Sequence, residues 1–149
     1  MKTLLAILLC AFSTSLSAQQ TGADAAPVRF RAVDVYVDSF GVPMAAYQLD
    51  FSVTNGVAKI VGIEGGEHPA FREPPFYDPE AMQRERVIIA AFSTESADKL
   101  PAGKTRVATI HLEIIGTAKP EFEIKVVTAG DQSGRKIVAS ATAEERKTQ

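Results

Sequence analysis

The chain lacks tryptophan, has a single cysteine and carries almost no excess charge. Its 149 residues contain 16 Lys and Arg against 18 Asp and Glu, a formal net charge of −2. A chain this close to charge balance, without a basic stripe, is not typical of a nucleic-acid binder. The length predicts one domain, large enough to bury a core without disulfides or a structural metal.

The first 18 residues have the pattern of a secretory signal peptide. A basic start precedes the apolar run 4–12, and small residues follow it. The run is too short for a transmembrane helix, which needs about 20 apolar residues. Cleavage after Ser17 and cleavage after Ala18 both fit these small residues. We therefore expect an exported protein, periplasmic or extracellular, with a signal peptide over 1–18 and a polar linker over 19–27.

The only cysteine, Cys10, lies inside that signal peptide. The cleaved chain would have no cysteine, which excludes a disulfide, a thiol nucleophile and a Cys-ligated metal site. An exported protein without disulfides is more typical of a bacterium than of a eukaryote. Removal of Lys2 leaves 15 basic residues against 18 acidic ones, a net charge of −3.

Alternating apolar and polar residues dominate after the linker, as in strands with one buried face. The clearest alternation spans 45–54. Its odd-numbered residues are apolar and its even-numbered residues, from Ala46 through Gln48 to Thr54, form the wet face. Turn residues separate the predicted strands at near-regular spacing. This pattern predicts an all-β, antiparallel β-sandwich with one short helix. Strands are expected from residue 28 and over 45–54, 57–63, 87–92, 106–115, 121–129 and 136–141.

One parity change and two turns in this pattern lead to local predictions. The alternation changes parity between Ala32 and Val33, which predicts a bulge or a strand that passes between sheets. Asn55-Gly56 is a strong hairpin signal, so the strand that follows it is expected to pair with the strand that precedes it. A second hairpin turn is expected over 130–134, where Gly and Asp flank polar residues.

The middle of the chain makes two further predictions. Asp78 followed by Pro79 is typical of a helix start, and about two helical turns are expected over 81–86. The stretch 87–92 is apolar on both parities, which predicts a central strand buried on both faces.

Three stretches of the chain share features with one family. Residues 46–53 and 58–63 suit an aromatic-rich, alternating strand pair. Residues 87–93 and 106–114 combine a buried strand, a Gly-containing loop and an Ala-Thr-Ile strand, and 129–137 holds an Asp-x-x-Gly turn before a last strand. Together they resemble the cohesin domain and, more broadly, the related β-sandwich of carbohydrate-binding modules.

The resemblance implies a cohesin-like sandwich, of jelly-roll or immunoglobulin-like type, over residues 28–142. The charged residues 143–149 after it are expected to form a flexible tail. It implies non-catalytic protein recognition in extracellular polysaccharide-degrading assemblies, or a relation to carbohydrate binders. The segment 67–86 departs from the family pattern, and no dockerin-type calcium repeat shares the chain.

No group of residues has the spacing of a catalytic or metal site. His68 and His111 are far apart and lie in no H-x-x-x-H or H-E-x-x-H pattern. The chain has no G-x-S-x-G motif, and the turn at Asp131 lacks the further acidic positions of a calcium loop. We expect no enzyme activity, no cofactor and no metal.

The candidate binding residues lie in the irregular, Pro-rich segment 67–86, where aromatic rings and arginines gather. Tyrosine and arginine are enriched at the energetic centres of protein interfaces, and loops often carry function. We expect a protein partner here, such as a dockerin-like chain or a surface scaffold. The alternative is an extracellular polysaccharide, which an exposed flat row of rings would favour and the lack of Trp disfavours. The candidates are Phe71, Arg72, Phe76, Tyr77, Arg84 and Arg86.

Overall fold

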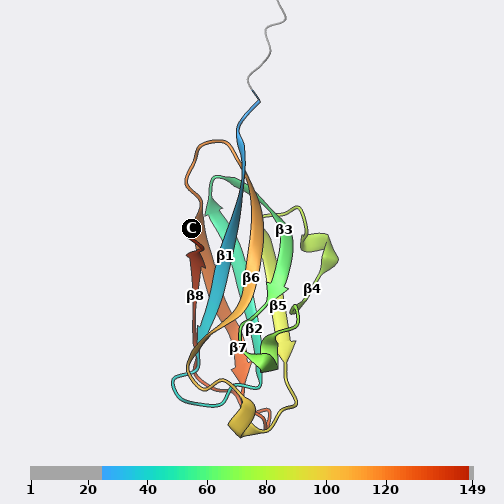
Figure 1. Cartoon of the computed structure of the whole chain (residues 1–149), viewed down its shortest axis with the longest axis vertical. Coiled ribbons are helices and arrows are strands. Elements are labelled where there is room, and N and C mark those ends of the chain that lie inside the picture. Colours follow the sequence, from blue (N-terminus) through green and yellow to red (C-terminus); the bar gives the residue numbers. More distant parts are fainter. Residues whose placement is uncertain (1–24, 148–149) are drawn as a thin grey trace, which may run out of the picture.

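Two antiparallel four-stranded sheets pack face to face in the computed structural model, which describes residues 25–147 (Figure 1). Sheet A has the strand order β3-β6-β1-β8, and sheet B has the order β4-β5-β2-β7. Three 3₁₀ helices of three residues each lie in the connections: η1 (Pro69–Phe71), η2 (Pro79–Ala81) and η3 (Ala97–Lys99). The strands are β1 (Val28–Asp38), β2 (Ala46–Asn55), β3 (Val57–Gly65), β4 (Phe76–Tyr77), β5 (Arg86–Phe92), β6 (Lys104–Ile115), β7 (Glu121–Gly130) and β8 (Ser140–Glu145).

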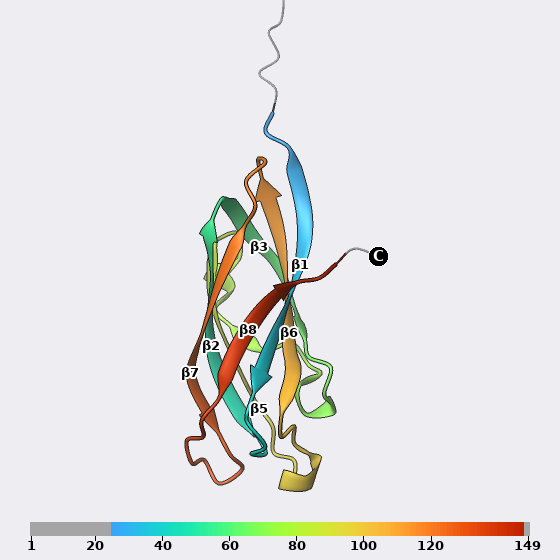
Figure 2. The same cartoon turned by 90° about the vertical axis from the view of Figure 1, so that its left-hand side faces the viewer.

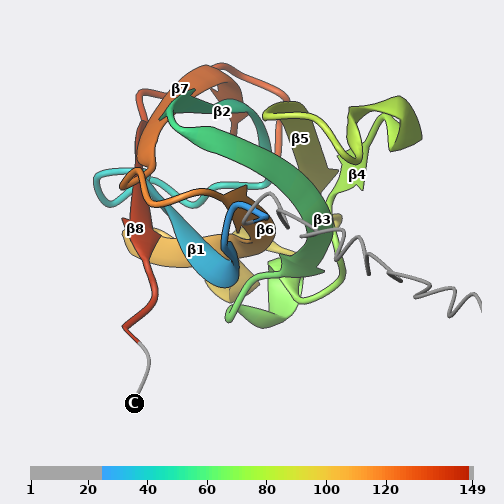
Figure 3. The ribbon, with the colours of Figure 1, turned by 90° about the horizontal axis from the view of Figure 1, so that it is seen from above.

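The all-β antiparallel sandwich predicted from the alternation is confirmed. Figure 3, seen from above, shows β2, β5 and β7 in one layer and β1, β6 and β8 in the other. The expected signal peptide and residues 19–24 of the expected linker lie outside the described residues, and residues 25–27 form no regular secondary structure.

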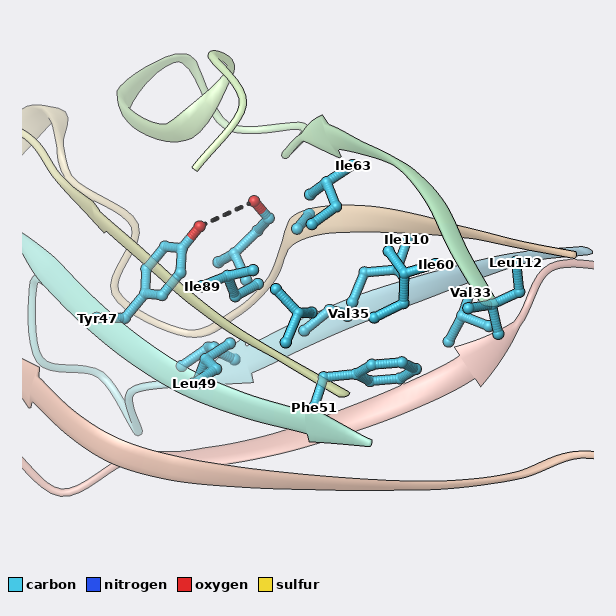
Figure 4. Packing of buried hydrophobic residues seen from close by; sticks show 14 of the residues in the cluster. Val33, Val35, Tyr47, Leu49, Phe51, Ile60, Ile63, Ile89, Ile110 and Leu112 are labelled. Atoms are coloured by element: carbon cyan, nitrogen blue, oxygen red, sulfur yellow. Dashed lines mark hydrogen bonds between the residues drawn. The ribbon is translucent and has the colours of Figure 1, made fainter. Parts of the chain in front are cut away.

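The core fills the space between the two sheets (Figure 4). Strand β2 supplies Leu49 and Phe51, both fully buried, and their outward neighbours Gln48 and Asp50 are half-buried. Each fully buried aliphatic or aromatic side chain contributes about 1.5–3 kcal/mol through the hydrophobic effect. The opposite layer contributes Val33, Val35, Ile60, Ile110, Leu112 and Ile114.

The expected parity change in β1 does not occur. The strand pairs with β6 along its whole length, and the register shift lies further on, between Val35 and Tyr36. There β6 has an extra residue, so that its neighbours Val107 and Ala108 are both buried. Without a switch at Ala32, the early apolar residues of β1 point outward, and Phe30 is 65% exposed.

The prediction of a hairpin at Asn55-Gly56 is also wrong, because this turn connects a strand of sheet B to a strand of sheet A. Strand β2 already pairs with β5 on one side and β7 on the other, so β3 has no free edge of β2 to join. Strand β3 pairs with β6 in sheet A instead. Gly56, with φ of +80°, turns the chain between the layers. The second expected hairpin turn, over 130–134, does form: the amide of Gly134 donates to the carbonyl of Asp131, and Gly130 bridges antiparallel to Lys136. Beyond this short hairpin the chain continues to β8 in sheet A.

The helix expected over 81–86 is only the single turn η2. Asp78 caps it as predicted, since its Oδ1 accepts a hydrogen bond from the amide of Glu80 at 2.9 Å. The chain then takes a left-handed conformation at Gln83, with φ of +67°. The amide of Gln83 donates to the carbonyl of Ile60, and the carbonyl of Arg84 accepts from the amide of Ile60. Hydrogen bonds to the edge of β3 therefore replace those of a longer helix.

The last strand lies further along the chain than the alternation predicted. Strand β8 covers Ser140–Glu145, whereas the expected strand over 136–141 reduces to one bridge between Gly130 and Lys136. Residues 143–145, expected in a frayed tail, pair with β1. Ala141 and Ala143 pack against the core.

A polar cluster on the outer face of sheet A holds this last strand in place. The carboxylate of Asp34, 12% exposed, accepts hydrogen bonds from Thr109 Oγ1 at 2.8 Å and Arg146 Nε at 3.0 Å. Arg106 lies beside it and donates to Thr109 Oγ1 at 2.8 Å. Burial raises the pKa of Asp34, but the hydrogen bonds from Arg146 and Thr109 and the nearby arginine charges outweigh burial and hold the pKa below its ordinary value of 3.8.

We predict that Arg146→Gln lowers the free energy of unfolding by about 1–3 kcal/mol at pH 7, because it removes the hydrogen-bonded ionic partner of the Asp34 carboxylate and leaves only Arg106, 4.0 Å away. A lowered pKa stabilises the fold above the ordinary value, and this stabilisation is lost as pH falls through the lowered pKa. The difference between wild type and variant should therefore shrink below about pH 4.

Urea denaturation across pH measures this difference. Lys99→Gln is the matched control, because Lys99 pairs with Glu95 at 3.4 Å where both side chains are more than half exposed. That exposed pair should change the stability by less than about 0.5 kcal/mol. An equal effect of the two substitutions would contradict the role of Asp34.

Candidate binding surface

The six predicted site residues divide into two rings turned toward the interior and four exposed side chains. Phe71 is 2% exposed and Tyr77 is half-buried, so neither ring is free to meet a ligand face. Phe76 is 69% exposed on β4. The three arginines, Arg72, Arg84 and Arg86, are exposed. The flat row of rings from one segment therefore does not form.

Phe71 is buried at one edge of the core. Its ring meets the ring of Tyr47 edge to face, with centroids 5.2 Å apart. The Tyr47 hydroxyl donates a hydrogen bond to the carbonyl of Val107 at 3.2 Å, from β2 across to β6 (Figure 4). Burial raises the pKa of Tyr47 far above its ordinary value, so the hydroxyl remains a donor. Phe71 is therefore a packing residue of the sandwich.

Phe76 instead joins a residue that the sequence interpretation did not include. Its ring stacks on that of Phe92, with centroids 6.2 Å apart and planes within 10° of parallel. Both rings are largely exposed, and Ile88 on the same face of β5 is 41% exposed. The prediction that 87–92 is buried on both faces is therefore wrong. Sheet A covers only one face of β5, and the described chain leaves the other face open.

A hollow of about 380 Å³ lies beside the two rings on the outer face of sheet B. Small side chains of β2 and β5 line it, and the turn after β7 borders it. That turn is held in shape by Asp131, which accepts hydrogen bonds from the amides of Ser133 and Arg135 at 2.9 and 3.0 Å. Residues lining the hollow include Ala46, Gln48, Phe76, Ala90, Phe92, Asp131 and Lys136.

A second hollow, of about 560 Å³, lies between η2 and the start of β5. Arg84 and Arg86 line it together with the acidic residues of the η2 segment. Arg86 is not free, because its Nε and Nη2 donate to the two carboxylate oxygens of Asp50 at 2.9 and 2.7 Å. The hydrogen bonds from Arg86 lower the pKa of Asp50 against the opposing effect of burial, so the pair stays charged.

The outer face of sheet A is different in character. It has a hollow of about 470 Å³ near Phe30 and His111, and Phe30 stacks on no other ring there. Charged groups on this side of the sandwich pair with one another: Arg146 with Asp34, and Lys59 Nζ with Glu113 Oε1 at 3.8 Å. Sheet B is therefore the face that offers exposed, stacked aromatic surface.

Sequence reasoning missed Phe92 and Ile88 because the run 87–92 is apolar on both parities. The signal that could have found them is Arg86, which begins the same face of β5 and marks it as facing solvent. Among residues 25–147, no three His, Cys, Asp or Glu side chains lie where they could hold a metal ion together. In the same part of the chain, no helix is long and apolar enough to cross a membrane.

The two phenylalanines of segment 67–86 should behave oppositely on truncation. Phe71→Ala removes a buried ring and should cost about 3–5 kcal/mol of stability. Phe76→Ala removes an exposed ring and should cost less than about 1 kcal/mol, mostly its contact with Phe92. Urea denaturation of the two variants measures both values, and similar losses would contradict the assignment of Phe71 to packing.

In comparisons with known proteins, no family model, no curated protein and no solved structure matches the chain.

Proposed function

We propose that the chain is an exported, non-catalytic binding module that recognises a protein partner through the outer face of sheet B. The observation that carries the proposal is the stacked pair Phe76 and Phe92, exposed by 69% and 64%. Exposed aromatic surface is costly in water, and contiguous apolar patches rimmed by polar residues mark interaction sites. The signal-peptide pattern of residues 1–18 supports export.

The composition of this face resembles that of a protein interface. Phe76, Phe92 and Ile88 form an apolar centre. Charged groups surround it, including the Arg86–Asp50 pair and Lys136. Such an apolar centre with a polar rim is the usual anatomy of specific protein complexes. The partner we propose carries an apolar side chain that enters the 380 Å³ hollow, with polar groups around it.

The resemblance to the cohesin domain favours the same conclusion, since it implies protein recognition in polysaccharide-degrading assemblies outside the cell. The partner would then be a dockerin-like chain or a surface scaffold. Neither the resemblance nor the geometry requires a catalytic group on this chain.

A polysaccharide ligand is the second candidate, and one observation favours it. The rings of Phe76 and Phe92 are nearly parallel, and Gln48, Asp131 and Lys136 line the hollow next to them. Flat rings beside hydrogen-bonding groups are a general means of binding a pyranose. The aliphatic neighbour Ile88 and the lack of Trp make the protein partner the better supported of the two.

The double variant Phe76→Ala/Phe92→Ala tests this function. The immobilised wild-type chain is used to capture exported proteins, and each captured protein is purified and its affinity for the chain is measured. Truncation of the aromatic centre should weaken binding about 30-fold or more, the effect of losing an interface hot spot. Phe30→Ala is the matched control, because Phe30 is 65% exposed on the other sheet and should not change the affinity.

A partner that binds the double variant as tightly as wild type would contradict the proposal, as would equal losses in Phe30→Ala. Retention of the wild-type chain on insoluble glycans, lost in the double variant and without any protein partner, would instead support the polysaccharide.

A further inference from the structure

Strand β7 leaves one of its two edges open. Strand β2 pairs with it on one side, and on the other side the described chain bonds only to its last residues, through Gly130 with Lys136 and Ala129 with Ile137. Within the described residues, the stretch from Phe122 to Val126 therefore makes no backbone hydrogen bond on this side. Figure 2 shows this edge at the side of the sandwich, with β8 of the other sheet beside it. An exposed strand edge is a template for another strand.

The open part of β7 is regular from Phe122 to Val126, and a register shift at Val127 ends this regular stretch. Its ladder with β2 has no register shift from Phe122 to Val126, and no proline interrupts it. The inward side chains Phe122, Ile124 and Val126 pack against the core but remain half-buried. A strand added at this edge would cover them further.

The outward side chains of this stretch are Glu123 and Lys125, exposed by 51% and 65%. Within one chain their side chains lie 3.0 Å apart. Two copies of β7 can pair antiparallel in a few registers only, because inward residues must face inward residues. Pairing centred on Glu123 sets that acid against itself, and pairing centred on Lys125 sets that base against itself.

Pairing centred on Ile124 is different. It places Glu123 of each copy opposite Lys125 of the other, and Phe122 of each copy opposite Val126 of the other. The outer face then has two opposite-charge pairs and the inner face two apolar pairs. Directly opposed charges of opposite sign stabilise antiparallel strands, and like charges destabilise them.

We propose that β7 is the dimerisation edge of this protein, and that its occupant is β7 of a second copy, paired antiparallel about Ile124. The contact is isologous, as expected of a two-fold homodimer. It joins sheet B of one copy to sheet B of the other. The outer faces that carry Phe76 and Phe92 then belong to one continuous sheet, and a partner with two docking elements could engage both.

Charge exchange tests the pairing. Sedimentation velocity of the exported full chain, from micromolar to millimolar concentration, should show a monomer–dimer equilibrium for wild type. Lys125→Glu and Glu123→Lys each create two like-charge contacts and should raise the dimer dissociation constant about tenfold or more. The double variant Glu123→Lys/Lys125→Glu restores opposite charges and should restore the dimer.

The double exchange is the internal control, since it has the composition of wild type and differs from it only in the order of the charges. Circular dichroism checks that each variant is folded, and either single reversal suffices if the other fails to fold. A wild-type chain that stays monomeric at millimolar concentration would overturn the proposal. A dimer that ignores the single reversals, or that the double exchange does not restore, would overturn it too.

Discussion

The mutual burial of the inward faces of sheets A and B is the interaction on which the rest of the structure depends. Leu49 and Phe51 of β2 pack against Ile60 of β3 and Ile110 and Leu112 of β6, and all five are fully excluded from water. Because side chains alternate along a strand, each strand that gives one face to this core must present its other face outward. A slip of one residue would reverse both faces at once.

The outer faces of sheets A and B carry different kinds of side chains. The outer face of sheet A carries charged and polar groups that pair with one another, centred on Asp34, next to the exposed Phe30, and this cluster also holds the C-terminal strand. Sheet B has an open aromatic pair, Phe76 and Phe92, beside a hollow of about 380 Å³. A sandwich whose stability comes from its interior can leave such apolar surface exposed.

The irregular segment before β5 supplies one ring to the core and one ring to the outer surface of sheet B. Close backbone crossings fix its path: a Cβ atom on Gly66 would collide with the carbonyl oxygen of Arg106, so only glycine fits there. This path directs Phe71 into the core and sets Phe76 on β4, next to β5. Phe71 and Phe76 are five residues apart, yet Phe71 is buried in the core and Phe76 is exposed on β4.

The sequence by itself determined the class of fold, most strand positions and the polar face of β2, because alternation reports directly which side chains can be buried. It could not determine which strands become neighbours. The turn at Asn55-Gly56 has the local chemistry of a hairpin, yet β3 joins the other sheet because both edges of β2 are taken. The exposure of Phe92 could not be predicted either, because an apolar residue is exposed or buried according to which other parts of the fold pack over it. Strand pairing, which only the tertiary structure decides, brought Phe76 of β4 to Phe92 of β5 and left the edge of β7 open.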